Sequence, residues 1–349
     1  MTNEIVNLLM KIASVKDAIS GMVLSGKAEA KLKHEARLRS THYSTRIEGN
    51  RLSLKQTKVI IDESRKDFYG RERDVKEVEN YWNALVEVEK LAGKQAEFSE
   101  NLVKTIHAMV HNGRRSKPTP YRTAQNVIRE AGSGAIVYLP PEAKDVPGLM
   151  KELISWVKQA ETVKVPVPII AGLVHYQFVT IHPYFDGNGR TARLLSTFLL
   201  MKGNFGLNGM FSLEEYHARD IESYYRELST HQHHNYYEGR EKAELTGWVL
   251  YFLKLLLEAY IELKDATREY SPADRKKLDN YKQLDRRARE ILPLFEAAET
   301  ITTRDIARML KIKPRMAAYL AREWVSKGFL KAVGGSNKKR AYKLSDKYK

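Results

Sequence analysis

Residues 182–193 read His182-Pro183-Tyr184-Phe185-Asp186-Gly187-Asn188-Gly189-Arg190-Thr191-Ala192-Arg193. Two glycines flank Asn188, immediately before a segment with helical periodicity. Glycine lets a backbone turn sharply and approach a ligand closely, and the first turn of a helix presents unpaired N–H groups at the positive end of its dipole. The stretch therefore predicts a cradle for an anion, of which phosphate is the usual example.

Four side chains of this stretch suit nucleotide chemistry. Arg190 and Arg193 share one face of the predicted helix, where two cations oppose the dipole unless a polyanion compensates them. Asp186 offers a hard oxygen ligand, and Mg²⁺ usually needs only one or two carboxylates besides substrate phosphates. His182 is suited to accept a proton at neutral pH. Each feature alone is more often a turn, a cap or a core residue, but packing hardly explains all of them within 12 residues.

The composition narrows the class of protein. The chain has 349 residues, enough for two or three domains, and a net charge of +16, which suggests an anionic partner. It has no cysteine, which excludes disulfides and thiol catalysis and is typical of a reducing cytoplasm. We expect a cytoplasmic protein without a signal peptide or membrane segment, because no basic region precedes an apolar N-terminal core and no uncharged apolar run reaches spanning length.

Helical periodicity dominates most of the chain and predicts a mainly α fold. It indicates helices over residues 1–24, 28–47, 73–92, 98–111, 145–160, 168–181, 212–228 and 246–266. One more helix is expected to begin at about residue 190. Gly49 suits the left-handed C-cap of the second helix, and Ser53 suits the N-cap of a further short one. Two β-prone runs, 125–128 and 135–139, flank the turn Gly132-Ser133-Gly134 and predict one β-hairpin.

Residues 285–349 form a compositionally distinct tail, with 17 Lys and Arg against 7 Asp and Glu, a net charge of +10. The pattern predicts a winged helix, with helices over 288–295, 302–310 and 315–327 and strands over 329–333 and 340–344. Arg315, Tyr319 and Arg322 share a helix face, and Lys338-Lys339-Arg340 lies at the expected wing tip, where DNA phosphates bind. DNA binding and protein contacts both stay open for this tail.

The stretch 182–193 resembles the signature of the Fic family, His-Pro-Phe-x-Asp/Glu-Gly-Asn-Gly-Arg-x-x-Arg, and departs from it only at Tyr184. The resemblance covers roughly residues 30–265. It implies a Fic-type helical bundle with one β-hairpin flap, to which the tail adds a winged helix-turn-helix domain. The implied division of the chain is an N-terminal helical region 1–110 with an inhibitory helix at about 38–48, a catalytic core 111–266, a linker helix 267–284 and the winged-helix domain 285–349.

The resemblance implies a protein adenylyltransferase, which transfers AMP from ATP to a Ser, Thr or Tyr hydroxyl of a target protein and to itself. It makes His182 the general base and Asp186 the ligand of a Mg²⁺ ion that bridges the phosphates. The residues it places on ATP are Gly187, Asn188, Gly189, Arg190 and Arg193, the last on the γ-phosphate. A flap that holds the target segment by strand pairing would comprise Ser133, Gly134, Ala135, Ile136, Val137, Tyr138 and Leu139.

Two tyrosines and one further motif complete the expected site. Tyr224 and Tyr225 line the adenine or ribose side, unless they are core aromatics on a helix. Ser44-Thr45-Arg46-Ile47-Glu48-Gly49 fits a second Fic-family pattern, Ser/Thr-x-x-x-Glu-Gly/Asn, which marks an inhibitory helix in that family.

Ser44 and Glu48 lie four residues apart and share a helix face, where Glu48 opposes the helix dipole unless a cation pairs with it. The resemblance implies that Glu48 pairs with Arg193 of the same chain and blocks placement of the γ-phosphate. The alternative is a solvated glutamate before a C-cap glycine. Removal of AMP from modified proteins and a homodimer also stay open.

Overall fold

The computed structural model describes residues 2–22, 24–62, 71–114, 116–129, 133–229, 235–238, 243–268, 280–281, 283–333 and 341–348. The chain divides into two compact units. Unit 1 comprises Met1–Ile19 and Leu32–Lys264, and unit 2 comprises Ser20–Lys31 and Asp265–Lys349. In the part of the chain that is described, no helix is long and apolar enough to cross a membrane.

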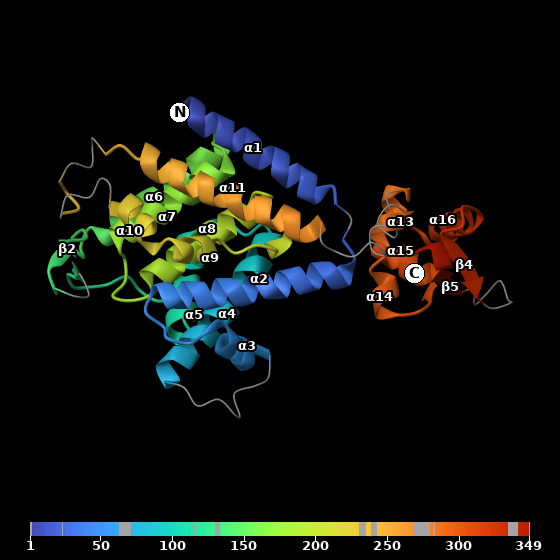
Figure 1. Cartoon of the computed structure of the whole chain (residues 1–349), viewed down its shortest axis with the longest axis horizontal. Coiled ribbons are helices and arrows are strands. Elements are labelled where there is room, and N and C mark those ends of the chain that lie inside the picture. Colours follow the sequence, from blue (N-terminus) through green and yellow to red (C-terminus); the bar gives the residue numbers. More distant parts are fainter. Residues whose placement is uncertain are drawn as a thin grey trace. The chain divides into compact units, whose positions relative to one another are not determined.

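Unit 1 is a helical bundle with two buried helices at its centre. α7 (Val167–Ile181) and α8 (Asn188–Lys202) are buried along most of their length and pack against each other. α4 (Glu72–Gly93) and α5 (Glu100–Asn112) bury one face against α8, and α6 (Val146–Thr162) buries one face against α7 (Figure 1). Further helices that lie wholly or mostly in unit 1 are α1 (Asn3–Ser20), α2 (Gly26–Ile47), α3 (Leu54–Asp62), α9 (Leu213–Arg219), α10 (Ile221–Ser229) and α11 (Thr246–Arg268).

Most helix ends lie close to the residues that the sequence indicates. Gly49 follows α2 with a φ of 91°, which is the left-handed region, and the Ser53 hydroxyl accepts a hydrogen bond from the Gln56 N–H at the start of α3. The single helix predicted over 212–228 is wrong. Asp220 has non-helical torsions between α9 and α10, and its carboxylate accepts from the Ser223 N–H at 3.0 Å, so it caps a second helix.

The predicted hairpin is present but short. β1 (Ile128–Arg129) pairs antiparallel with β2 (Ile136–Tyr138). Tyr138 is buried, and its hydroxyl donates to the backbone carbonyl of Thr180 at 2.9 Å. The strands are shorter than the β-prone runs because the ladder is irregular after its first pair. Gly132, predicted in the turn, lies outside the described residues.

Unit 2 contains short helices and a three-stranded antiparallel sheet of order β3-β5-β4. Its elements are α13 (Arg286–Glu290), α14 (Leu294–Ala297), β3 (Ile301–Thr302), α15 (Thr303–Met309), α16 (Pro314–Ser326), β4 (Leu330–Val333) and β5 (Ala341–Leu344). The single helix predicted over 288–295 is wrong, because Pro293 cannot donate an N–H and starts a separate helix. The predicted wing tip, residues 338–340, and most of the predicted linker 267–284 lie outside the described residues.

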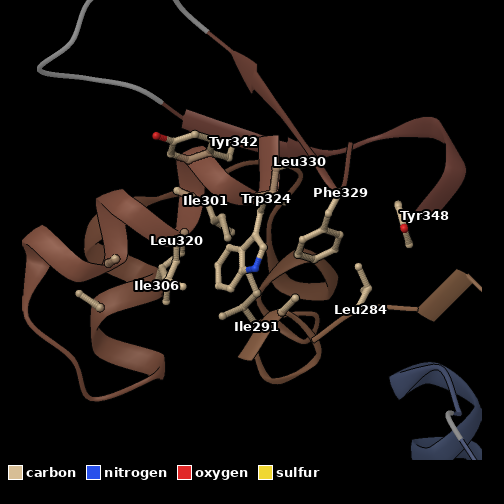
Figure 2. Packing of buried hydrophobic residues seen from close by; sticks show 14 residues of the cluster. Leu284, Ile291, Ile301, Ile306, Leu320, Trp324, Phe329, Leu330, Tyr342 and Tyr348 are labelled. Carbon is tan, nitrogen blue, oxygen red and sulfur yellow. The ribbon is translucent and has the colours of Figure 1, made fainter. Parts of the chain in front are cut away.

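Trp324 of α16 is the centre of the core of unit 2. The indole is 1% exposed and packs among buried side chains that include Ile291 and Phe329 (Figure 2). Its N–H donates to the Asp285 carboxylate at 2.8 Å. That carboxylate also accepts from the Ala288 N–H and caps α13. One acidic side chain therefore caps α13 and bonds the central tryptophan of the core.

Candidate active site

His182 lies at the point where α7 ends. Pro183 disfavours the helical conformation for the residue before it, and His182 takes the left-handed conformation with φ 51° and ψ 59°. Its Nδ1 lies 3.2 Å from the carbonyl oxygen of Val179. Since a carbonyl can only accept, Nδ1 carries the proton and Nε2 keeps a lone pair. Burial lowers the pKa of His182 to about 4, so the imidazole is a neutral proton acceptor at pH 7.

The turn at Gly187 opens α8 and leaves its first N–H groups without an intrahelical acceptor. Gly187 has a φ of 79°, and the first intrahelical bond runs from the Thr191 N–H to the Gly187 carbonyl at 3.0 Å. The N–H groups of Asn188, Gly189 and Arg190 precede that bond and are available to an anion. The amide side chain of Asn188 hydrogen-bonds both the N–H and the carbonyl of Tyr184. The side chain of Asn188 is therefore engaged within the loop, and only its backbone N–H has no intrahelical acceptor.

Asp186 is the half-exposed carboxylate of the site. It accepts hydrogen bonds from the Gly187 N–H at 2.6 Å and from Arg190 at 3.0 Å. Burial acts to raise the pKa of Asp186, but Arg190 and the Gly187 N–H outweigh it and hold the pKa below its ordinary value. No group of three or more His, Cys, Asp or Glu in the described ranges could hold a metal ion. A Mg²⁺ site here fits one protein carboxylate with the remaining ligands from substrate and water.

Arg193 is buried on the first turns of α8. Its Nε donates to the Ser44 hydroxyl at 2.8 Å, and its Nη2 donates to the Ser44 carbonyl at 2.9 Å and to Glu48 Oε1 at 2.8 Å. Its Nη1 is buried and has no partner among the described residues. Burial acts to lower the pKa of Arg193, but Glu48 and the nearby tyrosine side chains more than offset it and raise the pKa. Arg193 therefore carries a full charge with donor capacity to spare.

The Glu48 carboxylate lies against the first turn of α8. A Cβ added to Gly189 would lie 2.3 Å from Glu48 Oε1 and 3.2 Å from Arg193 Nη1. A side chain at position 189 therefore cannot coexist with this placement of Glu48. An anion at the N-terminus of α8 is stabilised by the helix dipole and by the arginine. The chain's own carboxylate thus occupies one side of the anion cradle.

Arg190 lies at the base of the same turn, 3% exposed, and faces two carboxylates. One is Asp186 at 3.0 Å and the other is Glu77 of α4, whose Oε1 lies 3.8 Å from Nη1. Glu77 also accepts hydrogen bonds from Asn50 at 3.0 Å and Arg73 at 2.9 Å. The sequence gives no local sign of Glu77, because it lies on a separate helix.

His107 of α5 supports the turn from the other side. Its ring stacks on Tyr184 with a centroid distance of 3.5 Å and an interplanar angle of 8°. Its Nε2 lies 2.9 Å from the backbone carbonyl of Asp186. His111, one helical turn further, has Nδ1 3.8 Å from the Asp186 carboxylate. The i,i+4 spacing of the two histidines is the sequence signal that could have indicated this contact.

The two tyrosines of α10 have different surroundings. Tyr224 is 2% exposed, and its hydroxyl lies 2.9 Å from His175 Nε2 in an aromatic cluster with His217 and Trp248. Tyr225 is 48% exposed. Tyr224 therefore packs as a core aromatic, while Tyr225 is half-exposed with its ring 5.2 Å from that of Tyr224.

In the predicted flap, residues 133–137 are exposed and Tyr138 is buried. Tyr138 thus anchors the hairpin, and the residues before it offer a surface. The exposed apolar side chains on this surface are Ile136 and Val137, and Phe185 of the motif loop is 61% exposed.

Comparison with known proteins finds similarity over part of the chain. Residues 97–200 match the Fic/DOC family. The chain is 30% identical over 199 residues to protein adenylyltransferase Fic of Drosophila erecta, and the aligned part covers 56% of this chain and 39% of that protein. The alignment thus spans less than half of that relative's length. Residues 97–200 are therefore similar to the Fic/DOC family, and a larger part of the chain is distantly similar to a Fic adenylyltransferase.

Solved structures share the fold at low sequence identity. A Fic family protein from Desulfovibrio desulfuricans G20 has a TM-score of 0.63 and 23% identity, covering 99% of this chain and 97% of that one. A Fic domain-containing signaling protein from Bacteroides thetaiotaomicron has a TM-score of 0.65 and 20% identity, covering 76% of this chain and 98% of that one. At these identities the likeness shows a mainly helical Fic fold.

Proposed function

We propose that the protein is a protein adenylyltransferase, which transfers AMP from ATP to a hydroxyl of a target protein and to itself. The observation that carries the proposal is a neutral imidazole, a half-exposed carboxylate, an open helix N-terminus and a buried arginine with a spare donor, all between His182 and Arg193. Phosphoryl-type transfer needs alignment and charge neutralisation more than covalent help.

In the proposed reaction the target hydroxyl oxygen forms a bond to the α-phosphorus, and the bond from that phosphorus to the β-bridging oxygen breaks. The hydroxyl proton goes to Nε2 of His182, and pyrophosphate leaves. The N–H groups at the start of α8 face the phosphate oxygens, and Arg193 binds the γ-phosphate. Mg²⁺ would be held by Asp186 and would neutralise charge on the phosphates. Triphosphate charge beside His182 raises the basicity of its imidazole from its low resting value.

We further propose that the site is autoinhibited by the segment Ser44 to Glu48. Glu48 accepts a hydrogen bond at 2.8 Å from Nη2 of Arg193, the side chain proposed to bind the γ-phosphate. Two like charges cannot share that position, because the carboxylate and the phosphate repel each other at close range. ATP then binds only with its terminal phosphate displaced, unless Glu48 moves away.

The test is incubation of the full chain with Mg²⁺ and ATP labelled at the α-phosphorus. Label on the protein is expected, and His182→Ala abolishes it. His34→Ala is the matched control, since His34 pairs with Asp62 on the surface of unit 1. In the Glu48→Gly chain, which lacks the proposed inhibitory carboxylate, labelling that His182→Ala leaves unchanged would refute the assigned base.

Removal of AMP from a modified protein is the alternative on the same site. The Glu48 carboxylate lies beside the cradle, where it could activate water. Loss of AMP from a pre-modified target, abolished by Glu48→Gly, would favour this alternative over the transferase.

A second candidate function, DNA binding, rests on the exposed face of α16 and the turn before it. Lys311, Lys313, Arg315 and Arg322 are exposed. None of them forms an ion pair with a carboxylate in the described ranges, whereas Lys327 and Lys331 do. Tyr319, 57% exposed, lies on the same helix. Exposed cations without an ion-pair partner favour a polyanion such as duplex DNA.

A gel shift with duplex DNA over a series of salt concentrations tests this function. Loss of a phosphate contact lowers the slope of log affinity against log salt by about 0.9 for each charge removed. Arg315→Ala and Arg322→Ala should each weaken binding, while Lys331→Ala, which removes a cation paired with Asp346, should not. Absence of a shift at low salt would refute DNA binding and leave protein contacts.

A further inference from the structure

Arg122 is a buried cation outside the motif. It lies in the segment between α5 and β1 and is 4% exposed. It forms no ion pair with a carboxylate among the described residues, and burial lowers the pKa of its guanidinium. A buried charge without a counter-ion is costly unless its N–H groups are satisfied. The buried charge of Arg122 must therefore be stabilised by its hydrogen bonds.

Among the described residues, the guanidinium of Arg122 donates only to backbone carbonyls. Its Nε donates to the carbonyl of His182 at 3.0 Å, its Nη1 to that of Ala124 at 3.1 Å and its Nη2 to that of Pro141. Its own backbone N–H donates to the carbonyl of Pro183 at 2.9 Å. Ala124 precedes β1 and Pro141 follows β2, so one side chain ties both ends of the hairpin to the residue that carries the proposed base.

Two other hydrogen bonds run from the hairpin to the same stretch. Tyr138 donates to the Thr180 carbonyl at 2.9 Å, and Asn126 donates to the Tyr184 carbonyl at 3.1 Å. Together with the bonds of Arg122, the carbonyls at positions 180, 182, 183 and 184 all accept from the hairpin segment. The backbone around His182 is therefore held by the hairpin from one side.

The backbone of His182 needs such support. A non-glycine residue in the left-handed region is sterically strained, and Pro183 has no N–H with which to stabilise the turn. The bond from Arg122 Nε to the His182 carbonyl fixes the peptide plane that follows the imidazole-bearing residue. A lysine could not replace this bond set, because a single ammonium lacks the planar fork that reaches three carbonyls at once.

We propose that Arg122 is a positioning residue that joins the hairpin and the His182 turn into one rigid body. The inference rests on the proposed function, in which a target hydroxyl on the hairpin must meet Nε2 of His182. We call the hydrogen bonds of Arg122 to the carbonyls of Ala124, Pro141 and His182 the clamp. With these bonds formed, the distance from a bound target segment to Nε2 of His182 is fixed before ATP binds. The anion cradle is separate, since it is formed by the first turn of α8.

The clamp predicts a split between catalysis and nucleotide binding. In the Glu48→Gly chain, Arg122→Lys should lower kcat for AMP transfer by about 100-fold, the order expected for misplacement by about 1 Å. The Kd of ATP should stay unchanged, and release of free AMP by hydrolysis should rise relative to AMP on protein. Arg37→Lys weakens the bond of α2 to Glu89 of α4 and is the control for a general loss of stability. It should leave kcat, the Kd of ATP and the release of free AMP unchanged.

Hydrogen exchange tests the clamp without any activity. Arg122→Lys and Arg122→Gln should speed amide exchange in residues 124–129 and 182–186 together, while α8 stays protected. Transfer by Arg122→Lys at the parent rate, or a loss of ATP affinity parallel to kcat, would overturn the proposal. So would unchanged exchange in either segment. If the Glu48→Gly parent itself transferred no AMP, the proposed adenylyltransferase function would be refuted. The hydrogen-exchange measurement would then still test the positioning role of Arg122.

Discussion

Replacement of Glu48 by glycine tests the autoinhibited site most sharply. Glu48 and Arg193 are joined at 2.8 Å, with 27% and 2% of their side chains exposed. A hydrogen bond to a charged group contributes about 1.5–3 kcal/mol. If the γ-phosphate must displace this bond, its removal should raise AMP transfer by about 10- to 150-fold, since about 1.4 kcal/mol corresponds to a factor of ten.

The same substitution should alter stability in a nucleotide-dependent way. Removing one partner of a buried ion pair costs about 3–5 kcal/mol, which is an upper limit here because Glu48 is partly exposed. Arg193 keeps its two bonds to Ser44 but loses its counter-ion. We therefore expect a lower Tm for Glu48→Gly without nucleotide, and a larger rise in Tm on addition of ATP than in the wild type.

The assay is label transfer from ATP labelled at the α-phosphorus, with Tm measured in parallel by calorimetry. Glu48→Gln is the matched control, because its amide oxygen can still accept from Arg193 while the charge is gone. It should activate less than glycine does. A transfer rate and an ATP-induced Tm shift that are both the same in Glu48→Gly and wild type would refute the reasoning.

Two further predictions follow from the titratable side chains of unit 1. Asp186→Asn removes the carboxylate proposed to bind Mg²⁺. It should lower AMP transfer by more than about 10-fold, because changing residues around a bound metal costs at least that much. A variant as active as its parent and equally dependent on Mg²⁺ would contradict this. Burial lowers the pKa values of His107 and His182 to about 4 and that of His217 to about 3, against about 6.5 in an unfolded chain. The unfolded chain therefore binds more protons below pH 6.5, and stability should fall on acidification by up to about 1.4 kcal/mol per pH unit for each group. An equal Tm at pH 7 and pH 5 would contradict this.

The sequence predicted the features that local rules determine. Glycines at 187 and 189 before a helical segment predicted an open helix N-terminus, and α8 begins at Asn188. Helical periodicity located the central helices to within a few residues. The errors are also local. Asp220 and Pro293 each end a helical run that periodicity alone continues, and β3 has only two residues, too few for a pattern to register.

The supporting contacts of the site could not be predicted from one sequence. Arg122 lies 60 positions from His182, and His107 lies 79 positions from Asp186. Ser44 and Arg193 are 149 positions apart. No spacing rule links such pairs, because their contact depends on how α2, α5 and the hairpin pack around α8. The resemblance to a family was the only source for Glu48, since a glutamate before a glycine has an ordinary structural explanation.

The central claim is that this chain transfers AMP, and isotopic position tests it most directly. The Glu48→Gly chain is incubated with Mg²⁺ and ATP labelled at the α-phosphorus in one sample and at the γ-phosphorus in another, and its intact mass is recorded. We predict label on the protein from the α position only, with a mass gain of one AMP residue and release of pyrophosphate. Label that arrives from the γ position would contradict the account.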